Sequence, residues 1–342
     1  MNTRLSEVVK MERIGTVLRS MGALYRLSPE KVDAFLGAYA LFEGDWSNDN
    51  GKKEAQLKDY YGVLNHLCAI GHVEKMYIPP SIDRSAGVLC NQRLFERKMV
   101  DDLGIQSGHR VLDIGSGRGR VANHVASLTN ANVTGINIDP VQVRDAQQYS
   151  RTNGRANQCA FIQASLNDPF PFESCSFDAV YQIQAFSYAK DTEKVLAEVF
   201  RVMEPGAKFS YLDWVLLDGY DPDNTHHVDL LNRVKPLIGA VDTPTPKQIC
   251  DFMRSVGFDI LFNEDVRGEQ HSKLIEGEDF YYRLARAAIN TLTKVHVLPE
   301  HFRVLFERIT RNGDAFVEAD QLGLASTCYQ IIARKPDAAS DR

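Results

Sequence analysis

The residues best suited to chemistry lie in one glycine-rich segment, 113–119, with the sequence Asp-Ile-Gly-Ser-Gly-Arg-Gly. An apolar run predicts a strand over 110–114, and a helical pattern follows over about 118–129. Glycines at alternate positions let the backbone turn tightly and approach a ligand closely. The spacing G-x-G-x-G matches neither the dinucleotide fingerprint G-x-G-x-x-G nor a phosphate loop. The segment is therefore predicted to hold a small molecule at a strand end, with a ligand-free turn as the alternative.

Strands and helices alternate after residue 110, which indicates a parallel α/β sheet whose strand ends share one edge. Strands are predicted at 110–114, 132–137, 159–164, 177–183, 207–216, 259–265 and 328–334. Helices are predicted at about 118–129, 140–153, 191–203 and 246–256. Pro205 and Gly206 are expected to form a turn before the fifth strand.

The remaining sequence predicts helices that cover this edge. Residues 1–100 are expected to form an N-terminal helical cap, 101–278 the core, and 279–322 a helical insertion in the cap. Residues 323–336 would add the final strand, and 337–342 a disordered tail. Apolar residues of the insertion would line an acceptor pocket, pack the cap or mediate a homodimer: Phe280, Tyr281, Tyr282, Leu284, Ile289 and Leu292.

Polar residues follow the second, third and fourth predicted strands. Asn137 stands where adenosine-binding sheets commonly place an acid for the ribose hydroxyls, although it could equally start a turn. Ser165 follows the third strand, where an adenine-reading group is expected. The fourth strand runs into the segment Gln184 to Tyr188, which would face the reacting group.

This order of features resembles the class I methyltransferases that use S-adenosyl-L-methionine (SAM). A closer resemblance, to the sterol 24-C-methyltransferases, rests on Tyr211-Leu212-Asp213-Trp214-Val215, on Asp218-Gly219-Tyr220-Asp221 with His227, on Gly135-Ile136-Asn137 with Gln142, and on the terminal Ala333-Arg334-Lys335-Pro336. It covers roughly 55–336 and is strongest over 110–265.

The resemblance implies a Rossmann-like, seven-stranded, mostly parallel sheet with helices on both faces, and SAM as the cofactor. It implies a hydrophobic small-molecule substrate, such as a sterol, a terpenoid or another natural product. The implied contacts to SAM come from Asp113, Gly115, Ser116, Gly117, Asn137, Ile138, Gln142, Ser165, Leu166 and Gln182.

The chain departs from the sterol enzymes where the acceptor would bind. Those enzymes have an aromatic, acidic, Trp-containing stretch where this chain has residues 69–77, and a Glu and a His where it has Gln184 and Tyr188. C-methylation of an alkene is suggested by the resemblance, and O- or N-methylation stays open. Cyclisation or isomerisation without methyl transfer is a further alternative that Gln184 permits, and a non-catalytic binding protein is disfavoured by the intact glycine loop.

Four side chains are candidates for catalysis, and each has a structural alternative. Tyr188 could act in the pocket or pack on the following helix, and Asp213 could act there or form an ion pair. His227 could cap or pair structurally, and His72 could be solvated. Tyr60 and Tyr61 could cover SAM or pack two helices together.

Composition excludes several classes of function. The 342 residues have a net charge of −6 and no basic run, which gives no attraction for nucleic acid and no overall attraction for an anionic membrane. The six cysteines are scattered without C-x-x-C pairs, and no cluster of metal ligands is evident. No apolar run is long enough to span a bilayer, so a cytoplasmic enzyme is expected.

Overall fold

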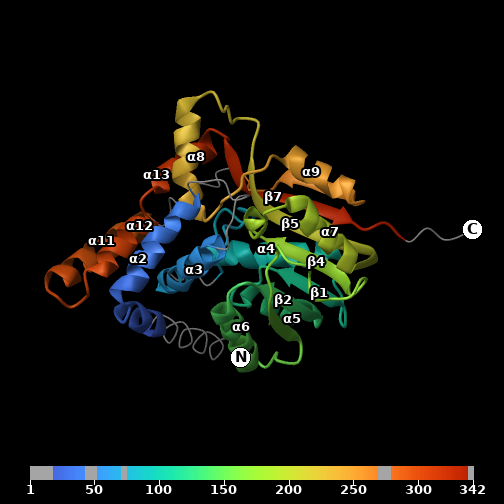
Figure 1. Cartoon of the computed structure of the whole chain (residues 1–342), viewed down its shortest axis with the longest axis horizontal. Helices are drawn as coiled ribbons and strands as arrows, with labels where there is room; N and C mark the ends of the chain where they lie inside the picture. The colour runs from blue at the N-terminus through green and yellow to red at the C-terminus, as the bar shows by residue number, and fades with distance from the viewer. Residues whose placement is uncertain (1–17, 43–51, 71–74, 269–278, 338–342) are drawn as a thin grey trace, which may run out of the picture.

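A computed structural model describes residues 18–42, 52–70, 75–268 and 279–337. Its centre is a seven-stranded sheet in the order β3-β2-β1-β4-β5-β7-β6 (Figure 1). The strands are β1 (Arg110–Ile114), β2 (Asn132–Asn137), β3 (Cys159–Gln163), β4 (Phe177–Ile183), β5 (Met203–Leu216), β6 (Asp259–Asp265) and β7 (Ala325–Arg334). Strands β1 to β5 pair in parallel, whereas β7 lies antiparallel between β5 and β6.

Helices cover both faces of the sheet because its central strands are apolar on both sides. One face packs against α4 (Val88–Leu103), α5 (Arg120–Thr129) and α6 (Pro140–Thr152). The other face packs against α7 (Thr192–Val202) and α9 (Pro246–Ser255). The Rossmann-like architecture expected from the sequence is confirmed.

Two further apolar clusters lie beyond the carboxyl ends of the strands. One joins the early helices α2 (Pro29–Gly37), η1 (Ala38–Phe42) and α3 (Lys52–Ile70) to α11 (Asp279–Lys294) and α12 (His301–Ile309). The other packs α8 (Thr225–Ile238) and α13 (Gly313–Gln321) around Trp214. Segments far apart in the sequence therefore form one helical cap, on the left in Figure 1.

Several details differ from the sequence predictions. Strand β5 begins at Met203, so Pro205 and Gly206 lie inside an irregular, bulged part of that strand rather than in a turn before it. Helix α8 was not predicted, although Asn224 caps it by accepting from the backbone N–H groups of His226 and His227.

Parts of the predicted helical cap, namely 1–17, 43–51 and 71–74, and residues 338–342 of the predicted tail lie outside the described residues. Among the residues that are described, no helix is long and apolar enough to cross a membrane.

Candidate cofactor and acceptor site

The glycine loop turns sharply between β1 and α5. Gly115, Gly117 and Gly119 all have positive φ angles, of 75°, 52° and 71°. A Cβ on Gly115 would lie 2.5 Å from the Cβ of Ala185, and one on Gly119 would lie 2.6 Å from the ring of Phe161. The loop is therefore compressed from both sides, and residues with side chains do not fit at these two positions.

A cavity of about 1200 Å³, open solvent at its mouth included, lies over this loop. The cavity is formed where the ends of β1, β2, β3 and β4 face α3, at the edge of the sheet where such folds bind small molecules. The sequence-predicted cofactor contacts that line it are Asp113, Gly115, Ser116, Gly117, Asn137, Ile138, Gln142, Ser165 and Leu166.

Asp113 gives the cavity a buried carboxyl group in which one oxygen, Oδ2, has no hydrogen-bond partner in the described structure. Burial raises the pKa of Asp113 to about 7. A cationic or hydrogen-bond-donating ligand group would satisfy this oxygen, so the site fits the amino acid part of SAM.

Asn137 combines both roles that its sequence position suggested. Its Oδ1 accepts from the backbone N–H of Asp139 at 2.8 Å, which fixes a turn, while the residue still lines the cavity. Asp139 in turn caps α6 through Val141. Gln142 is buried on the first turns of α6 and lies against Gly117.

Gln182 lies beneath the cavity rather than in its wall. It is fully buried, its Nε2 donates to Leu212 O at 3.3 Å, and its Oε1 accepts from Ala185 N at 2.9 Å. Ala185 is the residue that contacts Gly115. The geometry therefore gives Gln182 a position behind the glycine loop, with no lining surface of its own.

Tyr188 lines the cavity from η2 (Phe186–Tyr188) and is tied to the cap. Its hydroxyl donates to Gly239 O and lies 2.9 Å from the hydroxyl of Tyr61 on α3. Burial raises the pKa of Tyr188 well above that of a free phenol, so it is a poor base at neutral pH.

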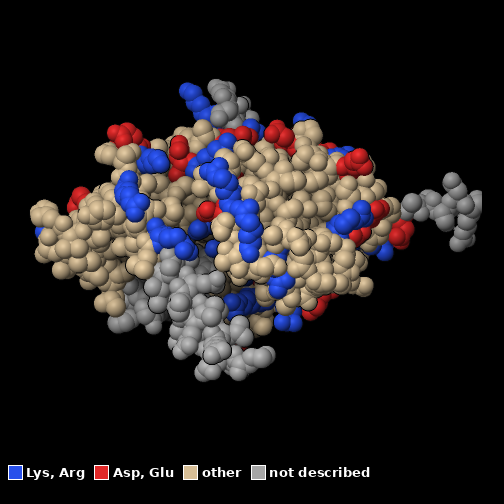
Figure 2. Space-filling model, turned by 90° about the horizontal axis from the view of Figure 1, so that it is seen from below, with Lys and Arg blue, Asp and Glu red and all other residues tan. Residues whose placement is uncertain are grey.

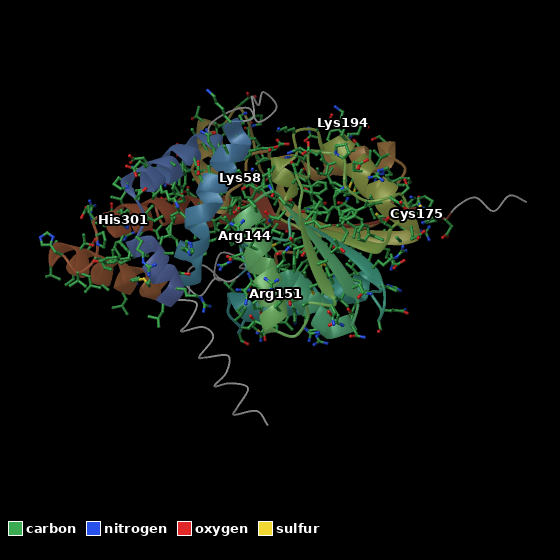
Figure 3. The ribbon with its side chains drawn as sticks, turned by 60° about the horizontal axis from the view of Figure 1, so that its bottom comes forward. Lys58, Arg144, Arg151, Cys175, Lys194 and His301 are labelled. Atoms are coloured by element: carbon green, nitrogen blue, oxygen red, sulfur yellow. The ribbon has the colours of Figure 1, made fainter. Side chains whose placement is uncertain are left out.

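Helix α3 forms the lid of the cavity through Tyr61, Glu54 and Lys58. Glu54 also forms an ion pair with Lys190 at 3.4 Å, so α3 is joined to the segment after β4 both by this pair and by the hydrogen bond between Tyr61 and Tyr188. Figure 3 shows α3, which carries Lys58, beside α6, which carries Arg144. Tyr60 instead points into a cluster of aromatic rings with Phe35, Tyr39 and Phe42.

The other catalytic candidates are not brought into the cavity. Asp213 is buried behind it, where its two oxygens accept from the backbone N–H groups of Phe186 and Trp214, both at 2.8 Å. Burial raises its pKa to about 7. His227 accepts from Asp221 N at 3.2 Å on α8, away from the cavity lining. His72 lies outside the described residues.

Asp213 therefore pairs with backbone amides rather than with the cation that was its expected structural partner. These bonds hold the start of η2 in place, so Asp213 positions the segment that carries Tyr188. The structural alternative for His227, a capping contact, matches its bond to Asp221.

Sequence reasoning missed a buried polar cluster at the cavity floor. Glu96 of α4 is fully buried and contacts Lys75 Nζ at 2.5 Å, Tyr77 Oη at 2.7 Å and His124 Nδ1 at 2.5 Å. Lys75 and Tyr77 line the cavity. A Glu among apolar residues of the expected helical region 1–100 was the one available signal, because a buried carboxylate needs partners.

Gln184 also has a role that the sequence did not indicate. Its Nε2 donates to Ile78 O at 3.1 Å and to Thr327 O at 2.7 Å, and its Oε1 accepts from Ile78 N at 3.2 Å. The amide thus joins the segment that follows Tyr77 to β7. A carboxylate could accept from Ile78 but could not donate to either carbonyl.

Comparison with known proteins agrees with this geometry. A family model described as a methyltransferase domain matches residues 112–211. Methyltransferase phqN of Penicillium fellutanum is 28% identical over 88% of this chain and 97% of its own length. Sterol methyltransferase-like 1 of Botryococcus braunii is 32% identical over 72% of this chain, and the match spans just under two thirds, 65%, of that relative.

Among solved structures, the cyclase SpnF superposes with a TM-score of 0.63 at 18% identity, over 83% of this chain and 97% of its own. That similarity concerns the fold alone. No group of three or more His, Cys, Asp or Glu side chains that could hold a metal occurs in the described part of the chain. Because the glycine loop opens onto a cavity suited to SAM, and because methyltransferases match it in sequence, the chain is a class I SAM-dependent methyltransferase, similar to the sterol C-methyltransferases.

Proposed function

We propose that the enzyme transfers the methyl group of SAM to an alkene carbon of a bulky hydrophobic acceptor of the sterol or terpenoid class. The observation that carries the proposal is the set of three tyrosine rings, Tyr61, Tyr77 and Tyr188, in the wall of the cavity. The relatives named as sterol methyltransferases support the acceptor class.

The cavity has two chemically different ends. Polar groups from the glycine loop, Asn137 and Ser165 suit the amino acid, ribose and adenine parts of the cofactor. Near the end of β4, aromatic and apolar residues outnumber the polar Lys75 and Gln184 in the lining: Leu57, Tyr61, Met76, Tyr77, Ile183, Ala185 and Tyr188. An apolar acceptor would bury its surface there favourably.

Carbon methylation requires alignment and stabilisation of positive charge more than it requires a base in the first step. SAM supplies an electrophilic methyl group when bound. An alkene carbon that takes this methyl group would break its bond to sulfur and release S-adenosylhomocysteine. The resulting carbocation would then lose a proton to a carboxylate at the cavity. Aromatic faces stabilise cations within about 6 Å of the ring. The tyrosine rings would serve this purpose, and α3 over the cavity would limit the access of water that would trap the cation.

The alternative chemistries have less support from these residues. O- or N-methylation commonly uses a base next to the acceptor atom, and Tyr188 is a poor base because its pKa is raised. The sequence left cyclisation without methyl transfer open because of Gln184. The amide of Gln184 makes three hydrogen bonds that join Ile78 to β7, which gives this residue a structural role.

A pair of matched acceptors tests the proposal. Purified enzyme with methyl-labelled SAM is incubated with desmosterol or cholesterol, which differ by one side-chain double bond, and with farnesol or its saturated analogue. Label should enter the unsaturated member of at least one pair and not the saturated member. Equal labelling of both members would instead indicate methylation of the shared hydroxyl oxygen.

A further inference from the structure

A buried carboxylate lies directly behind the wall of the cavity. Charged side chains are scattered over the surface in Figure 2, whereas the side chains of Glu96 and Lys75 are 0% and 8% exposed. Lys75 Nζ lies 2.6 Å from Oε1 and 2.5 Å from Oε2 of Glu96, so the ammonium group spans both oxygens. His124 Nδ1 lies 2.5 Å from Oε2. Such partners compensate the carboxylate for the hydration that it loses on burial.

Tyr77 connects this carboxylate to the cavity. The residue lines the cavity, and its hydroxyl donates to Glu96 Oε1 at 2.7 Å, with a second acceptor, Gln92 O, at 3.1 Å. Among the described residues, no group donates a hydrogen bond to Tyr77 Oη. A lone pair of this oxygen is therefore free to accept a proton while its own proton points toward Glu96.

The other two tyrosines in the cavity wall are bonded differently. Tyr188 donates to the carbonyl oxygen of Gly239, which is too weakly basic to take up a proton. The hydroxyl of Tyr61 lies 2.9 Å from that of Tyr188. Tyr77 therefore differs from both in having its hydroxyl on a carboxylate.

Two amide side chains hold the Tyr77 segment in place. Gln92 is 2% exposed, and its Nε2 donates to Lys75 O at 3.0 Å and to Tyr77 O at 2.9 Å. Gln184 bonds to both the N–H and the C=O of Ile78. Since residues 75–78 form no helix or strand, these contacts fix where Tyr77 lies. A group that is held in position reacts with little loss of freedom.

From this arrangement we propose that Tyr77 and Glu96 together remove the proton from the carbocation that methyl transfer leaves on the acceptor, an inference that rests on the proposed function. The C–H bond next to the cationic carbon breaks, and its electron pair forms the new C=C bond. The proton binds Tyr77 Oη while the Tyr77 O–H bond breaks and its proton passes to Glu96 Oε1. Tyr77 ends unchanged, and Glu96 ends as a carboxylic acid. The reverse transfer to water, once the product has left, restores the carboxylate.

This step does not require a free phenolate. Burial, together with the charge of Glu96, raises the pKa of Tyr77 well above that of a free phenol, so the residue stays protonated. Because one proton arrives as another leaves, Tyr77 carries a proton throughout. A proton next to a carbocation is strongly acidic, so a weakly basic acceptor is sufficient. Lys75 therefore does not prevent the transfer, although it stabilises Glu96 as a carboxylate.

The carboxylates that line the cavity have other contacts. Glu54 pairs with Lys190 at 3.4 Å, and Asp139 caps α6. Asp113 lies in the glycine loop, at the cofactor end of the cavity. Glu96, in contrast, is reached through a tyrosine of the acceptor end.

Tyr77→Phe tests the proposal because it removes the hydroxyl but keeps the ring and the Lys75–Glu96 pair. The enzyme and methyl-labelled SAM are incubated with desmosterol or farnesol. S-adenosylhomocysteine (SAH) is measured as the product of methyl transfer, and methylated alkene as the product of proton loss. Glu96→Gln is combined with Lys75→Met, so that no buried ammonium group is left without its counter-charge. Tyr329→Phe is the matched control, since Tyr329 is 9% exposed on β7 and does not line the cavity.

The wild type and Tyr329→Phe should form SAH and methylated alkene in equal amounts. Tyr77→Phe should release SAH at a rate within about threefold of the wild type but form at least about tenfold less alkene, with the remaining label in an alcohol made when water traps the cation. The Glu96→Gln/Lys75→Met variant should show the same shift in products. Circular dichroism establishes that each variant is folded.

Three results would overturn the proposal. In the first, Tyr77→Phe still forms SAH and alkene in equal amounts, whatever its rate, because the hydroxyl would then have a structural role alone. In the second, Tyr77→Phe binds SAH at least tenfold more weakly in calorimetric titration, which needs no acceptor, because Tyr77 would then belong to the cofactor site. In the third, the wild type labels neither acceptor, so the proposed function fails and this inference fails with it.

Discussion

Replacement of Gly115 by alanine should damage both folding and cofactor binding, for two separable reasons. The residue has φ +75°, and a left-handed conformation costs an alanine about 1–2 kcal/mol. The new Cβ would also lie 2.5 Å from the Cβ of Ala185, and overpacking of this kind costs about 1–3 kcal/mol. The expected loss of unfolding free energy is therefore about 2–5 kcal/mol.

Gly154 provides a control that isolates the backbone effect. It has φ +67°, and a Cβ there would meet no atom within 4 Å. Gly154→Ala should therefore cost only about 1–2 kcal/mol and leave SAH affinity unchanged. Gly115→Ala should weaken SAH at least tenfold, because relief of the contact with Ala185 displaces the loop that faces the cavity.

Urea unfolding and calorimetric titration with SAH measure the two effects. A compensating variant, Gly115→Ala with Ala185→Gly, removes the contact but keeps the backbone penalty, so it should recover most of the SAH affinity. The reasoning is refuted if Gly115→Ala behaves like Gly154→Ala in both assays, or if the compensating variant binds SAH no better than Gly115→Ala alone.

Three further predictions follow from the hydrogen bonds and charges of the site. Burial raises the pKa of Asp113 from 3.8 to about 7, so the free energy of unfolding should fall as pH rises from about 4 to about 7. In urea unfolding, Asp113→Asn should reduce this fall. An unchanged dependence of stability on pH would contradict the assignment. Tyr61→Phe removes the 2.9 Å hydrogen bond to the Tyr188 hydroxyl, so the free energy of local opening of α3 in hydrogen exchange should fall by about 1 kcal/mol. Tyr60→Phe should have a smaller effect, because it removes only a 3.5 Å hydrogen bond to Pro236 O. Gln184→Glu should lower the free energy of unfolding by about 1–3 kcal/mol at pH 8, because a carboxylate cannot donate to the carbonyls of Ile78 and Thr327. The loss should be smaller at pH 5, where a protonated Glu can donate one hydrogen bond. Equal losses at both values of pH in urea unfolding would argue against the amide's role.

The fold could be predicted from local patterns because the parallel strands are short and apolar and are separated by clear helix signals. All seven strands lie at or near their predicted ranges. The exceptions have physical causes. Pro205 and Gly206 are tolerated inside β5 because a bulge interrupts the pairing with β4 there. Helix α8 escaped prediction because Pro236 interrupts its pattern.

The site was predictable where residues act through local geometry and less so where they act through contacts distant in sequence. The glycine loop, Asn137 and Gln142 line the cavity because the strand ends place them there. The contacts of Glu96 with Lys75 and His124 depend on how α4 packs, which no spacing reveals.

Calorimetric titration of the purified enzyme with SAH, in parallel with Asp113→Ala, tests the central claim most directly, namely that the cavity over the glycine loop is the SAM site. Asp251→Ala is the control, since that carboxylate pairs with Lys247 on α9 at 2.5 Å and neither residue lines the cavity. The account predicts binding of one SAH per chain, at least tenfold weaker in Asp113→Ala and little changed in Asp251→Ala. Wild-type protein that binds no SAH, or an Asp113→Ala variant that binds it as tightly as wild type, would contradict it.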